Sequence, residues 1–580
     1  MIKYIGLAVC FLLAAVVINY SSAQSLNFNW STAKGTEGFF RVVKTTEGQW
    51  WFVTATNQPF YYKGVCAVNR AGTAGGRRAM PGKYAVTVDK KYNYQQSPDA
   101  FVQASIEKLR MLGFNALGAW ATEEFYNKGM PFTEIIEFFK EPPFLPATTR
   151  QQGLPDIFDT AWLINADRKV RALCTPLRYS KDLVGYFTDN EIGFGKTDDG
   201  GFDLGFEAGQ FDFSLLRTVL GMDSSKAACK AAWAFLLKRY NDSFAQLSAA
   251  WGLAVDSRAA IGKLNQARTA ISSKQYEADA AAFSSWYAST YFQVAQQLIR
   301  RYDPNHLILG CRFGAPPPTY VLDAILPYTD VISVNNYRPT LYERYDTVFR
   351  YTQLPILVGE ISWNTDLFKY IPFASETTSP LTVKERMFTT GTTTLQHAAL
   401  HDGIVGFTWY RWVQGISTDD RFCDGVVNYN DDLDIHKEAQ QTVLRTLDTL
   451  RISANGGNWK NAGINNGEMT LFFDSLRAGW NQPLRMELVA GKAVSPVYGW
   501  KMKGSVIKYV LSKGMLDINL KIDFEALSNN TRPIPGGTGL YTIHMIRDGE
   551  KWTGNYRGHY NGTVIAGKVH AFYFPRLNRL

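Results

Sequence analysis

The sequence predicts a (β/α)8 barrel, with a short N-terminal β extension and a C-terminal all-β domain. Between residues 60 and 452, short apolar runs alternate with helical patterns, and this alternation is typical of parallel sheets. Two of the runs, 183–187 and 355–359, are each followed closely by a glutamate. Eight runs of this kind fit one barrel that carries insertions.

The predicted strands are short and rich in aliphatic and aromatic residues, and they span 60–68, 114–120, 135–138, 183–188, 306–312, 330–335, 355–359 and 403–408. Predicted helices lie between or after them, at 97–112, 160–174, 225–251, 278–301, 341–353, 382–401 and 435–451. In a parallel barrel the carboxyl ends of all strands meet at one mouth. The residues that follow these strands are therefore expected to face one another.

The two ends of the chain differ in composition from the barrel region. Residues 1–23 have the features of an export signal: Lys3, an apolar stretch and a small-residue cleavage site after Ala23. This signal peptide predicts a secreted or periplasmic protein. Residues 24–59 are the expected β extension, which includes a hairpin.

Residues 453–580 are expected to form a β-rich accessory domain, either a sandwich or a small barrel, because short alternating strands are separated there by Gly and Asn. Two roles are open for it. It could bind carbohydrate through Trp500, Trp552 or Tyr560, or it could simply pack against the catalytic barrel.

Composition narrows the class of partner. The formal net charge is +9 and aromatic residues make up 14% of the chain, which suits a sugar-binding surface and an anionic polysaccharide. No nucleic-acid partner is predicted, since no dense Lys/Arg run occurs, and no transmembrane segment is predicted either. No metal or cofactor is expected. His397 and His401 lie four residues apart but lack the glutamate of the zinc-protease motif.

The residues around the two glutamates suit the cleavage of glycosidic bonds, which uses a pair of carboxyl groups. Asn190, directly before Glu191, can bind a sugar 2-hydroxyl. Tyr337 follows the sixth strand and can donate a hydrogen bond to Glu360. Trp409 comes at the end of the eighth strand and would offer an aromatic floor for a sugar ring.

This combination resembles the clan A glycoside hydrolases: Asn-Glu after strand four, Tyr after strand six, Glu after strand seven and Trp after strand eight. Several stretches are more narrowly similar to the β-agarases of family 50 and the β-galactosidase-like families around them, namely 49–54, 60–65, 185–191, 302–313 and 359–360. The similarity covers roughly residues 38 to 450. The loops and residues 409–412 depart from the agarase pattern, which leaves the exact galactan open.

The resemblance implies a retaining double displacement. Glu360 would attack the anomeric carbon, while Glu191 would protonate the departing oxygen and later deprotonate water. Glu191 therefore needs a raised pKa, and Glu360 needs hydrogen-bond donors. Tyr337 is the expected donor. Arg312, in the fifth strand, is either a second donor or a structural ion-pair partner.

Five further residues are expected at the mouth as substrate-binding candidates. Asn69 and Arg70 follow the first strand and Trp120 the second, while Trp363 and Trp412 are either stacking platforms or packing residues. The predicted substrate is a poly- or oligosaccharide with β-galactosidic bonds, such as agar, porphyran or carrageenan, with or without sulfate. Two alternatives remain open: a β-galactosidase for short oligosaccharides, and a carbohydrate-binding protein without catalysis.

Overall fold

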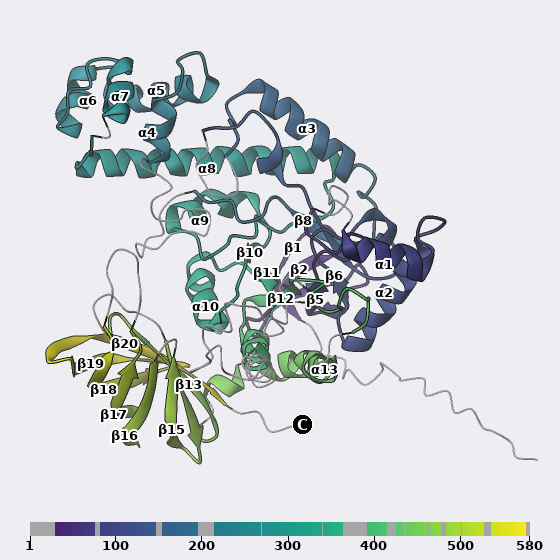
Figure 1. The fold of residues 1–580 in the computed structure, drawn as a ribbon, viewed down its shortest axis with the longest axis vertical. Helices are drawn as coiled ribbons and strands as arrows, with labels where there is room; N and C mark the ends of the chain where they lie inside the picture. Colours follow the sequence, from purple (N-terminus) through teal and green to yellow (C-terminus); the bar gives the residue numbers. More distant parts are fainter. Residues whose placement is uncertain are drawn as a thin grey trace, which may run out of the picture.

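The computed structural model describes residues 29–575, apart from 76–81, 147–153, 195–213, 268, 339, 363–390, 415–424, 434–436, 456, 462, 477–482, 500–501 and 527–534. The predicted export signal and Trp363 lie outside the described residues. A large α/β part and a separate β-barrel near the C-terminus make up the molecule (Figure 1). None of the described helices is both long and apolar enough to cross a bilayer.

Eight parallel strands form the predicted barrel, which confirms the fold class. They are β5 (Tyr62–Val65), β6 (Ala116–Leu117), β7 (Phe132–Ile135), β8 (Leu183–Phe187), β9 (Leu307–Ile308), β10 (Ile332–Val334), β11 (Ile356–Ile361) and β12 (Ile404–Trp409). The sheet runs from β10 through β12 and β5 to β9. A parallel bridge between Phe313 and Val334 then joins the segment after β9 to β10 and closes the ring. The third strand begins three residues earlier than predicted.

The barrel strands are buried on both faces, as their continuous apolar runs predict. Inward-facing Val184, Leu357 and Val405 form one apolar cluster. The N-terminal strands β1 (Trp30–Lys34), β2 (Arg41–Thr45), β3 (Trp50–Val53) and β4 (Pro59–Phe60) make a separate antiparallel sheet. Phe40 and Trp50 of this sheet region belong to the same cluster, so the extension packs against the barrel interior.

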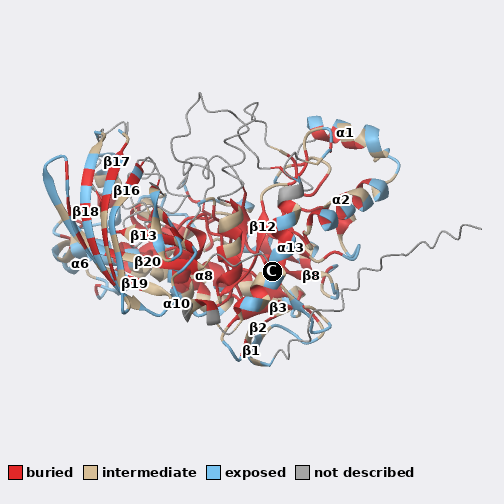
Figure 2. Ribbon diagram, turned by 90° about the horizontal axis from the view of Figure 1, so that it is seen from below, coloured by how far each residue is buried: buried red, intermediate tan, exposed pale blue. Residues whose placement is uncertain are grey.

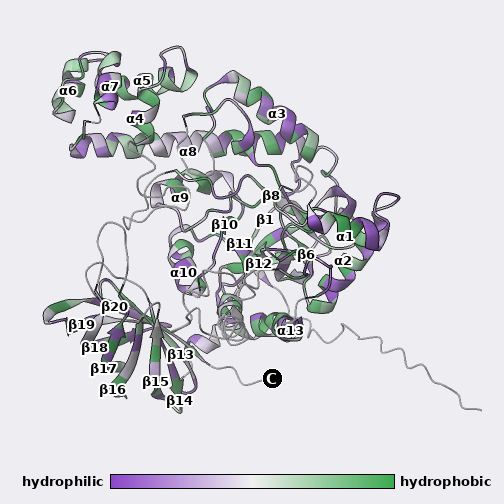
Figure 3. Ribbon diagram, viewed as in Figure 1, coloured by the Kyte–Doolittle hydropathy of each residue, from purple (hydrophilic) through white to green (hydrophobic). Residues whose placement is uncertain are grey.

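The helices that cover the barrel are α1 (Lys83–Tyr92), α2 (Asp99–Leu112), α3 (Thr160–Cys174), α8 (Lys274–Tyr302), α9 (Thr319–Ile325), α10 (Leu341–Thr352) and α13 (Lys437–Ala454). Helices α2 and α3 carry both hydrophobic and hydrophilic residues along their length (Figure 3). Their buried residues recur every three or four positions, which is the amphipathic pattern of a helix on a sheet. Of the predicted helix 382–401, residues 391–400 are helical, His401 is not, and 382–390 lie outside the described residues.

The prediction of one long helix over 225–251 is wrong. The chain forms α5 (Ala227–Lys238) and α6 (Phe244–Trp251) instead, separated by Asn241 and Asp242 with φ angles of 52° and 58°. Left-handed residues cannot continue an α-helix, and Asn and Asp adopt this conformation more readily than most. These two helices, with α4 (Leu215–Leu220) and α7 (Arg258–Gln266), gather at one end of α8 (Figure 1).

The C-terminal domain is a closed antiparallel barrel, so of the two predicted β architectures the barrel is the one that forms. Its strands are β13 (Gly467–Phe473), β14 (Leu484–Val489), β15 (Lys492–Gly499), β16 (Met502–Ser512), β17 (Met515–Phe524), β18 (Gly537–Asp548), β19 (Lys551–Tyr560) and β20 (Thr563–Pro575). Buried and exposed residues alternate along β17 and β18 (Figure 2). Trp552 and Tyr560 belong to its buried core, so neither can stack on a sugar. Trp500 lies outside the described residues.

Candidate active site

The two predicted catalytic glutamates lie at the carboxyl ends of barrel strands. Glu360 is the fifth residue of β11, and its carbonyl oxygen accepts a 2.8 Å hydrogen bond from the Asn336 backbone N–H. Glu191 follows β8 by four positions, and its own N–H donates to the carbonyl of Arg312 at 3.1 Å. The backbone of each glutamate is thus tied to the segment that follows a neighbouring strand.

Glu360 receives two hydrogen bonds from charged or polar donors. Nη2 of Arg312 lies 2.6 Å from Oε1, and the Tyr337 hydroxyl donates to Oε2. Both donors are side chains that the sequence singled out. An arginine and a phenol on the two oxygens stabilise the ionised form of the carboxyl group, which is the form a nucleophile needs.

Glu191 has the opposite environment. Burial, followed by the nearby charge of Glu360, raises its pKa from 4.5 to about 7. Asn335 donates a 2.9 Å hydrogen bond to Oε1. Two carboxyl groups with such different surroundings can serve as a nucleophile and a general acid in one reaction. Asn190 does not contact either carboxyl group; its Oδ1 accepts from Nε of Arg312 at 3.0 Å.

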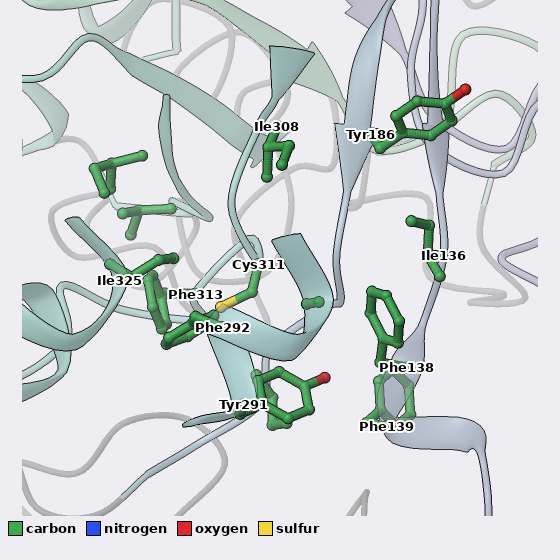
Figure 4. Close-up of a cluster of buried hydrophobic side chains, with 14 of the residues drawn as sticks. Ile136, Phe138, Phe139, Tyr186, Tyr291, Phe292, Ile308, Cys311, Phe313 and Ile325 are labelled. Atoms are coloured by element: carbon green, nitrogen blue, oxygen red, sulfur yellow. The ribbon is translucent and has the colours of Figure 1, made fainter. Parts of the chain in front are cut away.

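Asp189 and Asn335 are site residues that the sequence analysis did not select. Asp189 is fully buried, and it accepts hydrogen bonds from the Phe139 backbone N–H at 2.9 Å and from the Tyr291 hydroxyl. Burial raises its pKa to about 7. Tyr291 and Phe139 belong to an apolar cluster (Figure 4), so Asp189 anchors the Asn-Glu segment to this core. The sequence feature that points to these two residues is that the runs 183–188 and 330–335 end in polar residues.

Five non-glycine residues at the mouth have left-handed backbones, one after each of five consecutive strands, β5 to β9. They are Ala67, Trp120, Glu137, Glu191 and Arg312, with φ between 50° and 65°. Such residues are uncommon outside turns and cluster at functional sites. The repetition marks this rim of the barrel as the functional face.

The predicted binding residues after the first two strands are at the mouth, but each already has a partner within the protein. Asn69 donates to the Trp120 carbonyl at 2.8 Å and accepts from the Gly72 N–H at 2.8 Å. Arg70 forms a half-buried ion pair with Asp89, with Nη2 and Oδ2 2.5 Å apart. The guanidinium of Arg312 lies over the Trp120 ring, and its Cζ is 4.6 Å from the ring centroid. Trp120 therefore shields the arginine that holds Glu360.

The prediction that Trp409 offers a surface to a sugar is wrong, and of the two roles left open for Trp412 the structure favours packing. Trp409 is 1% exposed and packs edge-on against Phe114 in the core. Trp412 is 0% exposed, and its Nε1 donates to the Tyr84 hydroxyl at 2.9 Å. Side chains alternate between faces along a strand, so the aromatic residue directed at the mouth is the next one, Tyr410. Its half-buried ring lies 6.2 Å from that of Trp120.

Comparisons with known proteins agree with this geometry. A family model described as β-galactosidase matches residues 166–450. The resemblance to clan A glycoside hydrolases is confirmed. β-Agarase B of Vibrio sp. (strain JT0107) is 26% identical over 291 residues, which are 49% of this chain and 29% of that protein. β-Agarase A of the same strain is 25% identical over 352 residues, or 58% of this chain and 34% of that protein.

Solved structures show the same fold. A structure of an exo-β-agarase superposes with a TM-score of 0.59 at 20% identity, over 72% of this chain and 66% of that one. The agarase AgWH50C superposes with a TM-score of 0.57 at 20% identity, over 74% and 67%. The chain spans about a third of the length of the two curated Vibrio relatives.

Proposed function

We propose that the protein is a retaining glycoside hydrolase that cleaves β-galactosidic bonds in a galactan. The observation that carries the proposal is the contrast between two neighbouring carboxyl groups. Glu360 is held by an arginine and a tyrosine hydroxyl, whereas burial gives Glu191 a pKa of about 7. One group is prepared to attack and the other to donate a proton.

In the proposed reaction the Glu360 carboxylate attacks the anomeric carbon while Glu191 donates its proton to the glycosidic oxygen. The bond between the anomeric carbon and the glycosidic oxygen breaks, and the sugar remains covalently attached to Glu360. Glu191, now ionised, removes a proton from water, which attacks the same carbon and releases Glu360. Asn190 is poised by Arg312 to bind the 2-hydroxyl of the sugar.

The substrate class rests on the relatives, which are named β-agarases, and on the aromatic residues Trp120 and Tyr410 at the mouth. Agar, porphyran and carrageenan are the candidates among galactans. The match to a β-galactosidase family model favours a second candidate, a β-galactosidase for short oligosaccharides. Export remains a proposal from residues 1–23. A protein that only binds carbohydrate would not need two carboxyl groups with such different surroundings as those of Glu191 and Glu360.

Product analysis tests this proposal. The protein is incubated with oligosaccharides of agarose, porphyran and carrageenan and with an aryl β-galactoside, and products are followed by mass spectrometry and by proton NMR of the first anomer formed. We expect the β-anomer first from a galactan, and a loss of about 10²–10⁴ in kcat for Glu191→Gln. Glu360→Gln should be inactive, and Glu107→Gln, on the exposed face of α2, should be unaffected. Release of the α-anomer first would exclude retention, and cleavage of the aryl galactoside alone would favour the second candidate.

A further inference from the structure

Asn335 directly follows β10 at the mouth of the barrel and lies against Glu191. Its side chain is fully buried, and its Nδ2 is 2.9 Å from Oε1 of Glu191. The Oδ1 atom of the same amide has no hydrogen-bond partner among the described residues. An unsatisfied buried atom costs free energy, which a functional role of the amide can explain.

The direction of the Asn335 amide follows from the neighbouring Arg312. The oxygen and nitrogen of a buried amide are similar in size, so hydrogen-bond partners decide which is which. Nε of Arg312 can only donate, and therefore the atom of Asn190 that lies 3.0 Å from it is the oxygen Oδ1. The amide of Asn335 is 3.5 Å from this oxygen and must present Nδ2 to it. The reversed orientation would set two amide oxygens against each other.

This direction makes Asn335 a donor to Oε1 of Glu191 and determines where the acidic proton lies. In a protonated carboxyl group the oxygen without the proton is the stronger acceptor, so a donor at Oε1 places the proton on Oε2. Oε2 has no hydrogen-bond partner among the residues that the structure describes. It is therefore the oxygen that can donate to the glycosidic oxygen of a substrate.

The same hydrogen bond favours the ionised form of Glu191. A donor stabilises a carboxylate more than a neutral acid, which lowers the pKa. This contribution opposes burial and the charge of Glu360, which raise the pKa of Glu191 to about 7. Asn335 therefore contributes most while Glu191 is ionised, which in the proposed reaction is the step that removes a proton from water.

We propose that Asn335 is a positioning residue for the reaction, whose amide keeps the acidic proton of Glu191 on Oε2 and stabilises the carboxylate that later activates water. This inference rests on the proposed function. Arg312 contributes at a distance, because its hydrogen bond to Asn190 sets the direction of both amides.

The pH profile of kcat/KM distinguishes this role from a purely structural one. Asn335→Asp keeps the shape of the side chain but presents an acceptor to Glu191, whereas Asn335→Leu presents no polar atom. We expect the decline above about pH 7 to move upward by about one pH unit in Asn335→Leu, as for one lost hydrogen bond to a charged group, and further in Asn335→Asp. Reduced activity with the decline at the wild-type pH in both variants would overturn the inference.

A second measurement does not depend on turnover. The carboxyl C=O band of Glu191 is titrated by infrared difference spectroscopy in the protein without substrate, and the band is assigned by its absence in Glu191→Gln. We expect the midpoint of this titration to rise in both Asn335 variants. A midpoint equal to that of the wild type would overturn the inference and leave the proposed function intact.

Asn115→Asp is the matched control for the loss of a barrel amide. Asn115 precedes β6 at the opposite end of the barrel, where its Nδ2 donates to the Tyr61 carbonyl at 2.9 Å. This change should lower Tm and leave the midpoint of Glu191 where it is in the wild type. A wild-type protein that cleaves no β-galactoside would overturn the proposed function together with the inference, whatever the midpoint.

Discussion

Arg312 and Glu360 form an ion pair that is almost closed to solvent. Nη2 and Oε1 are 2.6 Å apart, and the exposed fractions of the two side chains are 0% and 7%. Through Nε the same guanidinium binds Asn190, the residue before Glu191. One side chain therefore connects the segments that carry both proposed catalytic glutamates, and its contact with Glu360 favours the first of the two roles that the sequence left open for Arg312, that of a hydrogen-bond donor to Glu360.

Replacing Arg312 by lysine should weaken both of its contacts, the ion pair with Glu360 and the hydrogen bond to Asn190. A lysine carries a point charge and cannot reproduce the planar fork that reaches Glu360 and Asn190 together. We expect kcat/KM to fall by about 10² or more, since breaking a buried pair costs about 3–5 kcal/mol, and Tm to fall as well. Arg301→Lys, in a pair where the arginine side chain is 60% exposed, is the control for an arginine-to-lysine change. Activity within threefold of wild type would contradict the assigned role.

The pH dependence of activity should show the titration of Glu191. Its pKa is raised to about 7, so the protonated acid is present below this pH and is lost above it. We expect kcat/KM to decline above about pH 7, and the residual activity of Glu191→Gln to lack this decline. Asp189 also has a pKa raised to about 7, but it is buried behind the site. Asp189→Asn should keep the decline; its disappearance there would assign the titration to Asp189.

Gly359 is a glycine because of a close approach within the site. A Cβ added at this position would lie 2.4 Å from Oδ1 of Asn335 and 3.2 Å from Cβ of Arg312. We expect Gly359→Ala to displace Asn335 from Glu191 and to lower kcat at least tenfold, with a near-normal circular dichroism spectrum. Gly262→Ala is the control, because no atom lies within 4 Å of its added Cβ and alanine favours the α7 helix by up to about 1 kcal/mol. A fully active Gly359→Ala would show that Asn335 is dispensable.

Stability should depend on Glu343, which lies on α10 and is 5% exposed. Burial raises the pKa of its carboxyl group from 4.5 to about 7. Because the folded-state pKa lies above the unfolded one, stability is lost as the pH rises from about 4.5 through 7. Glu343→Gln should raise the stability at pH 8 by up to about 3 kcal/mol and have little effect at pH 4.

Thermal unfolding at the two pH values measures this effect, and Glu277→Gln, exposed on α8, is the matched control. An equal gain in Tm at both pH values would show that the ionisation of Glu343 is not the cause. The charge of Arg485 on β14 lowers the pKa of Glu343 and so partly offsets the effect of burial, which means that the same measurement reports on the contact between the two barrels.

The order of strands and the positions of Glu191 and Glu360 follow from the sequence, because burial on both faces imposes a local, continuous apolar pattern on each strand. The same pattern does not define where a strand starts, which is why β7 begins three residues early. It also does not define which face a residue at a strand end takes, so the sequence favours Trp409 although Tyr410 is the residue directed at the mouth.

Only the tertiary structure decided the contacts between residues distant in the chain. Arg312 reaches Glu360 and Asn335 reaches Glu191 because the strands close into a ring, and the eight C-terminal strands form a barrel rather than a sandwich because β13 pairs with β20. The raised pKa of Glu191 likewise depends on burial by segments far away in sequence. Apolar periodicity is a local property that a sequence displays, whereas registry, burial and charge pairing arise only when separate segments meet.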